Sequence, residues 1–339
     1  MSTIKHVAAR AGVSFTTVSH VLNGTRRVSD AARQRVEQAI AEMGYAPSAV
    51  ARALKTSETC ILGVLVPNIT NPFFAELTRG IEDCCLRADY SVFLCSSDDD
   101  PVRQSRYLQT LLERRVDGLL LAAAAGEPAA LAKRLVPTGV PTVVVDRGVP
   151  GLESDLVRID HQAGAELAVS HLLSLGHRRV ACLSGPSEFV VSRERVAGWR
   201  SALEKAGIEI PESWLLEGDF SAPVGHELAR QLLGHDPDIT AIFASNDLLA
   251  IGALRAAAEL GIAVPQALSV IGFDGIELGS YIYPALTTVG YPIRALGEAA
   301  ATVLLERIGG GSTTRRDVVL APKLTLREST GRCVPGPDR

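Results

Sequence analysis

Polar side chains stand at the ends of several apolar runs of this chain, where predicted strands stop. Asp146, Asn246 and Asp274 occupy such positions. Because open α/β sheets bind ligands beyond the carboxyl ends of their strands, we expect these side chains to converge. Together with an arginine, Arg193 or Arg195, they can hydrogen-bond the hydroxyl groups of a neutral polyhydroxylated ligand. The pattern therefore predicts a sugar or polyol site.

Aromatic side chains near the same strand ends could cover the apolar side of a sugar ring. The candidates are Phe73, Phe74, Phe220 and Tyr291. Each candidate also has an ordinary structural interpretation, since Phe73 and Phe74 can belong to the core and a strand-end Asp or Asn can cap the next helix. The convergence of several such residues is the stronger argument for a ligand site.

A second kind of chemistry lies near the start of the chain, over residues 12–24. On a helix that begins after Ser14, the apolar side chains fall on one stripe, while Thr16 and His20 point away from it. A helical pattern over residues 4–11 precedes the turn. This arrangement is typical of a helix-turn-helix, whose second helix reads DNA.

The charge of the chain is unevenly distributed, which fits that interpretation. Residues 1 to 58 hold 8 Lys and Arg against 4 Asp and Glu, a net charge of +4. Because the net charge of the whole chain is -4, the remaining residues carry a net charge of -8. A basic head on an acidic body indicates that only the head meets a polyanion.

The head is expected to be a three-helix domain over residues 1–45, with Ser29 as the cap of the third helix. Pro47 prevents that helix from continuing, and the segment that follows has room for only about two turns. Helices shorter than roughly 12 residues are marginal in water. We therefore predict a hinge helix and linker over residues 46–59 that is helical only when something holds it.

From Cys60 onward, apolar runs alternate with helical stretches, which predicts doubly wound parallel sheets. Two groups of about five such runs indicate two lobes. The predicted strands are 60–66, 91–95, 116–123, 141–145, 156–159, 179–183, 241–244, 268–273, 286–289, 318–320 and 324–326. The core is expected to span residues 60–329, and residues 330–339 to form a disordered tail.

Composition excludes several classes of function. The six cysteines form no CxxC pair, so we expect reduced thiols and no metal site in a cytoplasmic protein. No run approaches the roughly 18 apolar residues that span a bilayer, which argues against a membrane protein. No phosphate loop, nucleophile elbow or dinucleotide fingerprint is present, so no cofactor and no enzyme activity are expected. A sugar-processing enzyme and a plain solute-binding protein remain the alternatives from other classes.

The order of these parts resembles the lactose/galactose repressor family of bacterial transcription regulators, over residues 3 to about 328. The chain looks most similar to the ribose and purine repressor branch of that family. The segments that carry the resemblance are 7–14, 17–23, 44–48, Asn71-Pro72-Phe73-Phe74, Arg115-Val116-Asp117-Gly118, Leu175-Gly176-His177-Arg178, Ala244-Ser245-Asn246-Asp247, Gly272-Phe273-Asp274 and Leu286-Thr287-Thr288-Val289.

The resemblance implies a core like that of the periplasmic sugar-binding proteins, with three crossovers between its lobes. The first lobe would comprise about 60–160 and 292–320, and the second about 161–291 and 321–329. It also implies a homodimer on a near-palindromic operator, in the cytoplasm and on the nucleoid when bound to DNA. The absence of a leucine heptad after residue 329 argues against a tetramer-forming helix.

The resemblance also implies DNA-binding positions. The base-reading positions correspond to Phe15, Thr16 and His20, of which Phe15 departs from the family because a phenyl ring cannot hydrogen-bond a base edge. The candidates for phosphate contact are Thr17, Ser19, Asn23, Arg26 and Ser29. Leu54, followed by Lys55, takes the place of the leucine that enters the minor groove in resembling members.

The effector positions that the resemblance selects are Phe73, Asp146, Arg195, Phe220, Asn246 and Asp274. Purine-binding members carry a further pocket arginine where this chain has Phe189 and Val190, which favours a sugar or polyol, for example one like ribose, over a nucleobase. Tyr291 replaces a glutamine of many relatives, so we expect it at the pocket floor. The predicted function is a repressor controlled allosterically by a small ligand between the lobes. A nucleobase-responsive repressor of the same architecture is the alternative.

Overall fold

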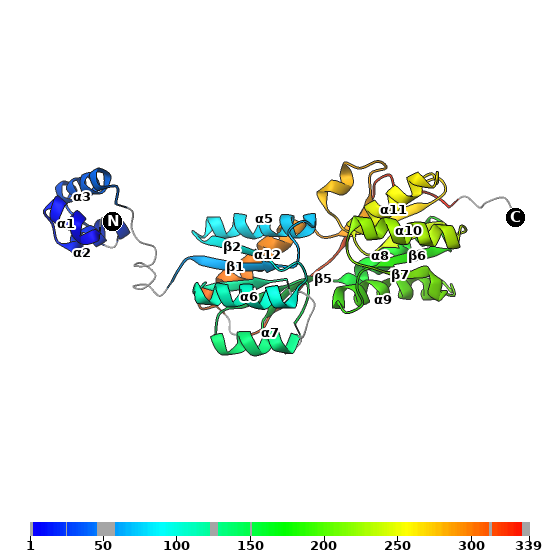
Figure 1. Ribbon diagram of the computed structural model, residues 1–339, viewed down its shortest axis with the longest axis horizontal. Helices are drawn as coiled ribbons and strands as arrows, with labels where there is room; N and C mark the ends of the chain where they lie inside the picture. The colour runs from blue at the N-terminus through cyan, green and yellow to red at the C-terminus, as the bar shows by residue number, and fades with distance from the viewer. Residues whose placement is uncertain are drawn as a thin grey trace. The chain divides into compact units, whose positions relative to one another are not determined.

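The structure is a computed structural model of the chain, and it describes residues 3–24, 26–45, 58–122, 128–149, 151–311 and 314–333. It divides into two compact units, Met1–Thr59 and Cys60–Arg339 (Figure 1). The predicted hinge helix lies outside the described residues.

The first unit holds the three predicted helices, α1 (Ile4–Ala11), α2 (Phe15–Asn23) and α3 (Asp30–Met43). Val7, Val18 and Val36, one from each helix, are fully buried and form its small core. Gly12 ends α1 with φ 63°, a left-handed conformation that costs glycine nothing. Ser14 caps α2, since its Oγ accepts a hydrogen bond from the Thr17 N–H at 3.1 Å. The helix-turn-helix prediction is confirmed.

The second unit begins with a lobe built on one sheet, here called the N-lobe. Its strands are all parallel and lie in the order β11 (Asp317–Leu320), β5 (Asp155–Ile159), β4 (Thr142–Val145), β3 (Gly118–Leu121), β1 (Ile61–Val66) and β2 (Ser91–Ser96). One face packs against α5 (Pro72–Arg87) and α12 (Ile293–Ile308), and the other against α6 (Pro101–Glu113) and α7 (Pro128–Leu135), which η1 (Val136–Thr138) follows. The inner strands are buried on both faces, which explains their continuous apolar runs.

The second lobe, here called the C-lobe, repeats this plan. Its strands lie in the order β12 (Lys323–Thr325), β10 (Thr287–Gly290), β9 (Ser269–Asp274), β8 (Ala241–Ala244), β6 (Val180–Ser184) and β7 (Leu215–Glu217). Helix α8 (His161–Ser174) packs against α9 (Val190–Lys205), and α10 (Ala222–His235) against α11 (Asp247–Glu259). Short 3-10 turns are η2 (Glu212–Trp214) and η3 (Glu277–Ser280). Only β12 runs antiparallel to its neighbour among the described strands.

The chain passes between the lobes after β5, after β10 and after β11 (Figure 1). In each sheet the first five strands follow the doubly wound order, β2-β1-β3-β4-β5 and β7-β6-β8-β9-β10. The predicted fold class is confirmed. The carboxyl ends of the two sets of strands meet where the lobes join, which places the strand-end side chains there.

The structure differs from the sequence-based expectation at two places. Strand β7, only three residues long and half-buried, has no apolar run that could reveal it. Residues 330–333, expected in a disordered tail, are bound to the C-lobe, because the Gly331 N–H donates to Ser269 Oγ at 3.0 Å and the Cys333 N–H to the Leu175 carbonyl at 2.9 Å. No described helix is long and apolar enough to cross a bilayer.

Candidate ligand-binding cleft and DNA-facing helix

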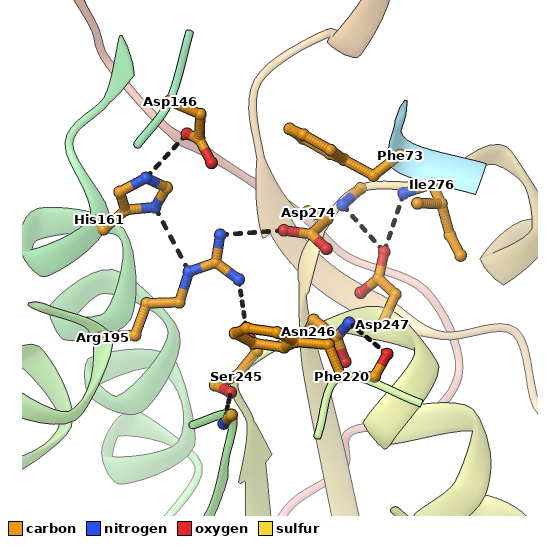
Figure 2. A network of polar contacts seen from close by, with 12 residues as sticks. Phe73, Asp146, His161, Arg195, Phe220, Ser245, Asn246, Asp247, Asp274 and Ile276 are labelled. Atoms are coloured by element: carbon orange, nitrogen blue, oxygen red, sulfur yellow. Dashed lines mark hydrogen bonds and ion pairs between the residues drawn. The ribbon is translucent and has the colours of Figure 1, made fainter. Parts of the chain in front are cut away.

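A polar cleft lies between the lobes and is lined by side chains from both (Figure 2). The six residues expected to bind an effector all line it: Phe73, Asp146, Arg195, Phe220, Asn246 and Asp274. Asn71, Phe74, Arg147 and Val191 complete the lining. The structure thus brings together residues that are up to 203 positions apart, from Asn71 to Asp274.

The ends of β4 and β9 position the two cleft aspartates. Asp146 follows β4 with φ 65°, and Asp274 ends β9 with φ 112°. Side chains other than glycine rarely adopt positive φ, and such conformations persist only where the surroundings enforce them. Both cleft carboxylates thus stand on backbone that the surrounding fold holds at positive φ.

Arg195 connects the two carboxylates (Figure 2). It projects from α9, is 4% exposed, and its Nη2 lies 3.1 Å from Oδ1 of Asp274. Its Nε–H donates to Nδ1 of His161 at 3.3 Å, and its Nη1 donates to the Ser245 carbonyl. Its guanidinium also stacks over Phe273, 4.0 Å from the ring centroid. Each guanidinium nitrogen of this buried cation thus has an acceptor, as a charge without water requires.

The arginine also fixes the tautomer of His161. A guanidinium Nε–H can only donate, so Nδ1 of His161 must accept, and the ring proton resides on Nε2. That Nε2 lies 2.8 Å from Oδ1 of Asp146. His161 therefore directs its Nε2–H toward Asp146, while its Nδ1 accepts from Arg195, the arginine that pairs with Asp274.

The two aspartates differ in charge behaviour. Burial would raise the pKa of Asp146, but His161, Arg195 and Arg147 hold it at about 2. Burial raises the pKa of Asp274 to about 6, although Arg195 beside it acts in the opposite direction. Asp146 is thus a permanent carboxylate, whereas Asp274 titrates near neutral pH.

Asn246 has two roles at this site. Its Oδ1 accepts from the Leu249 N–H at 2.8 Å, so it caps α11 as the structural interpretation allowed, and its Nδ2 donates to the Phe220 carbonyl at 3.2 Å. One amide hydrogen of Asn246 is left for a ligand. The bond to Phe220 also holds the loop whose ring forms one wall of the cleft.

The aromatic wall depends on a glycine. A Cβ at Gly185 would lie 2.2 Å from Cζ of Phe220, so no other residue leaves room for this ring. The ring stacks on Phe189 with centroids 6.3 Å apart, and the Arg147 guanidinium lies 4.3 Å from the Phe189 centroid. Arg147 also pairs with Asp99, at 3.1 Å.

Three further residues belong to this network: Asp247 and Arg147, which sequence reasoning placed at strand ends but did not select as effector residues, and His161, which it missed. Asp247 is fully buried behind Asp274, and its carboxylate receives the N–H groups of Gly275 and Ile276 at 2.9 and 2.8 Å. Burial and the nearby Asp274 raise the pKa of Asp247 to about 8. The signal for Asp247 and Arg147 was their place directly beside chosen strand-end residues. His161 stands at the start of a helix, and the sequence gives no signal that it belongs to the site.

Tyr291 is not where the sequence placed it. It does not line the cleft but packs, half-buried, against the N-lobe core. Residue 291 follows β10, which runs into the crossover to α12, and there the apolar core of the first lobe takes up the ring. The expectation that it forms the pocket floor is therefore wrong.

The cleft is narrow in this conformation. Its cavity measures about 20 Å³, room for one or two water molecules. The lobes also touch beside it, because Ile276 from the C-lobe side is buried in the N-lobe core and the Glu277 N–H donates to Glu76 of α5 at 3.1 Å. A sugar ring can enter only when the lobes or their aromatic side chains move apart.

The described head places its candidate residues on and around α2. Phe15 is 58% exposed, so it does not pack inward, and Thr16 is exposed beside it. Ser19 and His20 are half-buried, and the Thr17 hydroxyl lies 2.9 Å from the capping Ser14 hydroxyl. Arg26 and Ser29 are exposed. Asn23 is the last residue of α2, and Leu54 and Lys55 lie outside the described residues.

The described residues contain no group of three His, Cys, Asp or Glu side chains that could hold a metal ion. The chemistry available in the cleft is therefore that of hydrogen bonds, charge and aromatic faces. Carboxylates accept from hydroxyls, one amide hydrogen donates, and phenyl rings cover apolar C–H surfaces. On the head, exposed small polar and cationic groups surround one helix.

Comparison with known proteins gives matches over nearly all of the chain. Residues 3–48 match the model of bacterial regulatory proteins of the lacI family, and residues 59–328 that of periplasmic binding proteins and the sugar binding domain of the same family. The ribose operon repressor of Escherichia coli (strain K12) is 42% identical over 330 residues, which is 97% of this chain and 100% of that protein.

Two solved structures are similar to the model. The lac repressor dimer bound to operator and the anti-inducer ONPF has a TM-score of 0.88 at 31% identity, with 97% of this chain and 99% of that chain covered. A transcriptional regulator from Enterococcus faecium with bound ribose has a TM-score of 0.73 at 37% identity, with 81% and 100% covered.

Proposed function

The chain belongs to the lacI family of bacterial regulatory proteins, and on that premise we propose that it is a DNA-binding repressor controlled by a sugar or polyol between its lobes. The observation that carries the proposal is that one buried arginine, Arg195, pairs with Asp274 directly and is linked to Asp146 through His161 inside an aromatic-walled cleft. A cleft of this chemistry binds hydroxyl groups in fixed directions.

We infer that the effector is a neutral sugar of pentose size. The ribose operon repressor at 42% identity and the ribose-bound regulator at 37% identity support this class. The residues at the positions of the additional purine-binding arginine, Phe189 and Val190, offer no charge to a nucleobase. In our scheme Asp146 and Asp274 accept from ring hydroxyls, and Phe73 and Phe220 cover the ring faces.

The head supplies the DNA contacts in this scheme. Helix α2 enters the major groove with Phe15, Thr16 and His20 toward the bases, and the exposed phenyl ring of Phe15 touches a thymine methyl group. The phosphate contacts come from Thr17, Ser19, Asn23, Arg26 and Ser29, and Leu54 with Lys55 acts at the minor groove between two heads. The chain then works in the bacterial cytoplasm, on the nucleoid.

The protein acts as a homodimer in this proposal. Operators of the family are near-palindromic, and the similar lac repressor structure is a dimer on its operator. The N-lobe exposes apolar side chains at its edge strand and the nearby end of α5, namely Phe93, Leu94 and Leu86, which are 42%, 44% and 71% exposed. An apolar edge strand without a neighbour in the chain invites a second copy.

Ligand control follows from the lobe contacts. A sugar in the cleft changes the spacing between lobes that meet at Ile276 and Glu277, and the second copy transmits the change to the paired heads. Such coupling requires that the sugar bind one lobe arrangement better than the other, typically by about 1–3 kcal/mol. We propose no enzymatic step, and turnover of a bound sugar by pure protein would contradict this.

The experiment compares the full chain with a fragment of residues 60–339, which forms a compact unit of its own. Only the full chain should bind an operator fragment, and its log affinity should fall with log salt by about 0.9 per phosphate neutralised. The fragment should retain the sugar-dependent rise in Tm. Undiminished operator binding by the fragment would refute the scheme.

A further inference from the structure

A second cavity lies in the C-lobe, on the far side of α9 from the cleft, and most of its exposed lining is apolar. It measures about 250 Å³ and opens between α9, the inner strand β6 and the edge strand β7. Helix α9 covers the face of the C-lobe sheet opposite to α10 and α11 (Figure 1). None of its lining residues lines the cleft, since Arg195 and Val191 point to one side of the helix and Ser192, Val196 and Arg200 to the other.

A buried hydroxyl without a partner marks this cavity. Ser192 is 1% exposed, and its Oγ has no hydrogen-bond partner among the described residues. A serine at this helical position can usually bond the carbonyl four residues earlier, but here the Glu188 carbonyl accepts from Arg193 at 2.9 Å. A buried hydroxyl left unpaired is costly, so a group in the cavity that bonds it gains affinity.

Two guanidinium groups border the same cavity. Arg193 and Arg200 are seven residues apart on α9, so they lie on one side of the helix, about 10 Å apart along its axis. Arg193 is held by the Ser187 and Glu188 carbonyls at 2.7 and 2.9 Å through one nitrogen, Nη1. Arg200 is exposed and makes no hydrogen bond or ion pair within the described part of the chain.

The opposite wall supplies an acceptor. Oε1 of Glu217, at the end of β7, accepts from the N–H and the hydroxyl of Ser187, both at 2.9 Å. Its second oxygen can accept from a hydroxyl group. Val196 and Leu215 form the apolar part of the lining between these polar groups. The cavity therefore offers cationic donors, hydroxyls and a hydroxyl acceptor around a lining that is mostly apolar.

We propose that this cavity binds a small polyhydroxylated anion, a phosphorylated sugar or a sugar acid, as a second ligand separate from the cleft effector. The anionic group pairs with Arg200 and the free face of Arg193, because guanidinium groups bind phosphate and carboxylate in a bidentate way. The hydroxyls of the ligand bond Ser192 and Glu217. The proposal does not depend on the function proposed above.

The test is isothermal titration of the full chain with ribose 5-phosphate and with gluconate. Saturable binding of at least one probe is expected. Arg200→Gln should weaken it about tenfold or more through the loss of a charge-assisted contact, and Ser192→Ala about threefold through the loss of a neutral one. Arg230→Gln, which removes another exposed arginine, from α10, is the control and should bind like the wild type.

The cleft variant Asp274→Ala separates the two sites. Binding of the probe should persist in this variant at wild-type affinity. The proposal is overturned if neither probe binds the wild type, if Arg200→Gln and Ser192→Ala both bind like the wild type, or if Asp274→Ala abolishes binding. Arg200 is exposed, so loss of folding cannot imitate the expected result for Arg200→Gln.

Discussion

At the scale of single residues, the cleft depends on how one arginine is shared. Arg195 pairs with Asp274 directly and is linked to Asp146 through His161. A substitution of Arg195 or His161 therefore changes the hydrogen bonding of the cleft carboxylates. Such a network orients the hydrogen-bonding groups of the cleft before a ligand binds, and so sets the directions in which ligand hydroxyls can bond. Discrimination among sugars should therefore reside in these side chains.

Asp274→Ala should abolish the rise in Tm that a binding sugar causes, while operator affinity stays the same. A ligand at 100 times its Kd stabilises by about 2.7 kcal/mol through mass action, a shift that is easily measured by thermal unfolding with a panel of pentoses, hexoses and polyols. Asp98→Ala removes a strand-end aspartate outside the cleft and is the control. A normal shift in Asp274→Ala would remove this residue from the site.

Sugar affinity should weaken as the pH falls through about 6. Asp274 has a pKa of about 6, so below that pH it is protonated, and it loses both its pairing with Arg195 and its capacity as an ionised acceptor. Asp146, with a pKa of about 2, stays ionised throughout and adds no second inflection. Titration calorimetry between pH 5 and pH 8 measures this. Asp274→Asn should bind weakly and without the inflection, and an unchanged inflection there would assign the titration to another group.

At the scale of elements, the alternation of strands and helices could be predicted because a buried parallel strand has to be apolar along its whole length. The same rule located Asp146 and Asp274, since a strand end is visible in the chain as the point where the apolar run stops. His161 could not be chosen in this way, and Asp247, although it stands beside the strand-end Asn246, could not be distinguished from a helix cap. Their roles arise from contacts with Arg195 and Ile276, 34 and 29 residues away.

The helical periodicity of α2 could not predict the direction of a side chain at the border of the apolar stripe. Thr16 points clearly away from the apolar face of α2, but Phe15 lies at its edge, and the pattern allowed either direction. In the structure the ring is exposed, because the small core of the head is already filled by Val7, Val18 and Val36. The side chain is thus free to meet a partner.

Substitutions on and beside α2 should separate base reading from phosphate contact. Thr16→Ala should lower affinity for the operator by about 1–3 kcal/mol and relax the preference at one base pair. Arg26→Ala should weaken operator and random DNA equally and reduce the salt slope by about 1. Fluorescence anisotropy with both DNAs at several salt concentrations distinguishes them. Equal losses on both DNAs for Thr16→Ala would exclude it as a base contact.

The segment after the head should act as a separate element. Leu54→Ala should weaken operator binding and reduce the bend of the bound DNA, since an apolar wedge opens a base step at an expense of a few kcal/mol that added contacts offset. Gel mobility of permuted operator fragments reports the bend. The sugar-dependent Tm shift should not change, and a normal bend with Leu54→Ala would assign the minor groove to another residue.

At the scale of the whole molecule, the two lobes have to do more than enclose a ligand. Ile276 and the bond from Glu277 to Glu76 tie the C-lobe to α5, and α5 packs on α12 beside the edge of the N-lobe sheet. A change in lobe spacing at the cleft is therefore passed to the lobe that carries the exposed apolar edge. Ligand control and dimerisation meet in the same lobe.

The double substitution Phe93→Ser and Leu94→Ser should convert a dimer into a monomer. Both side chains stand on the edge strand β2, 42% and 44% exposed, and a stable interface of about 1,200–2,000 Å² needs its apolar centre. Sedimentation at micromolar concentration measures the state. Affinity for the full operator should fall strongly, because the second head is no longer held at a high effective concentration. The affinity of a single head for a half-site should change little.

The matched control for this change lies on the same lobe. Val136→Ser removes from η1 an apolar side chain that is 63% exposed, and η1 follows α7 on the face of the sheet opposite to α5. It should leave the dimer and operator binding intact, and both variants should keep the sugar-dependent Tm shift because neither touches the cleft. A double variant that still sediments as a dimer would show that the two copies meet through another surface, and the route from cleft to DNA would then have to run through the C-lobe.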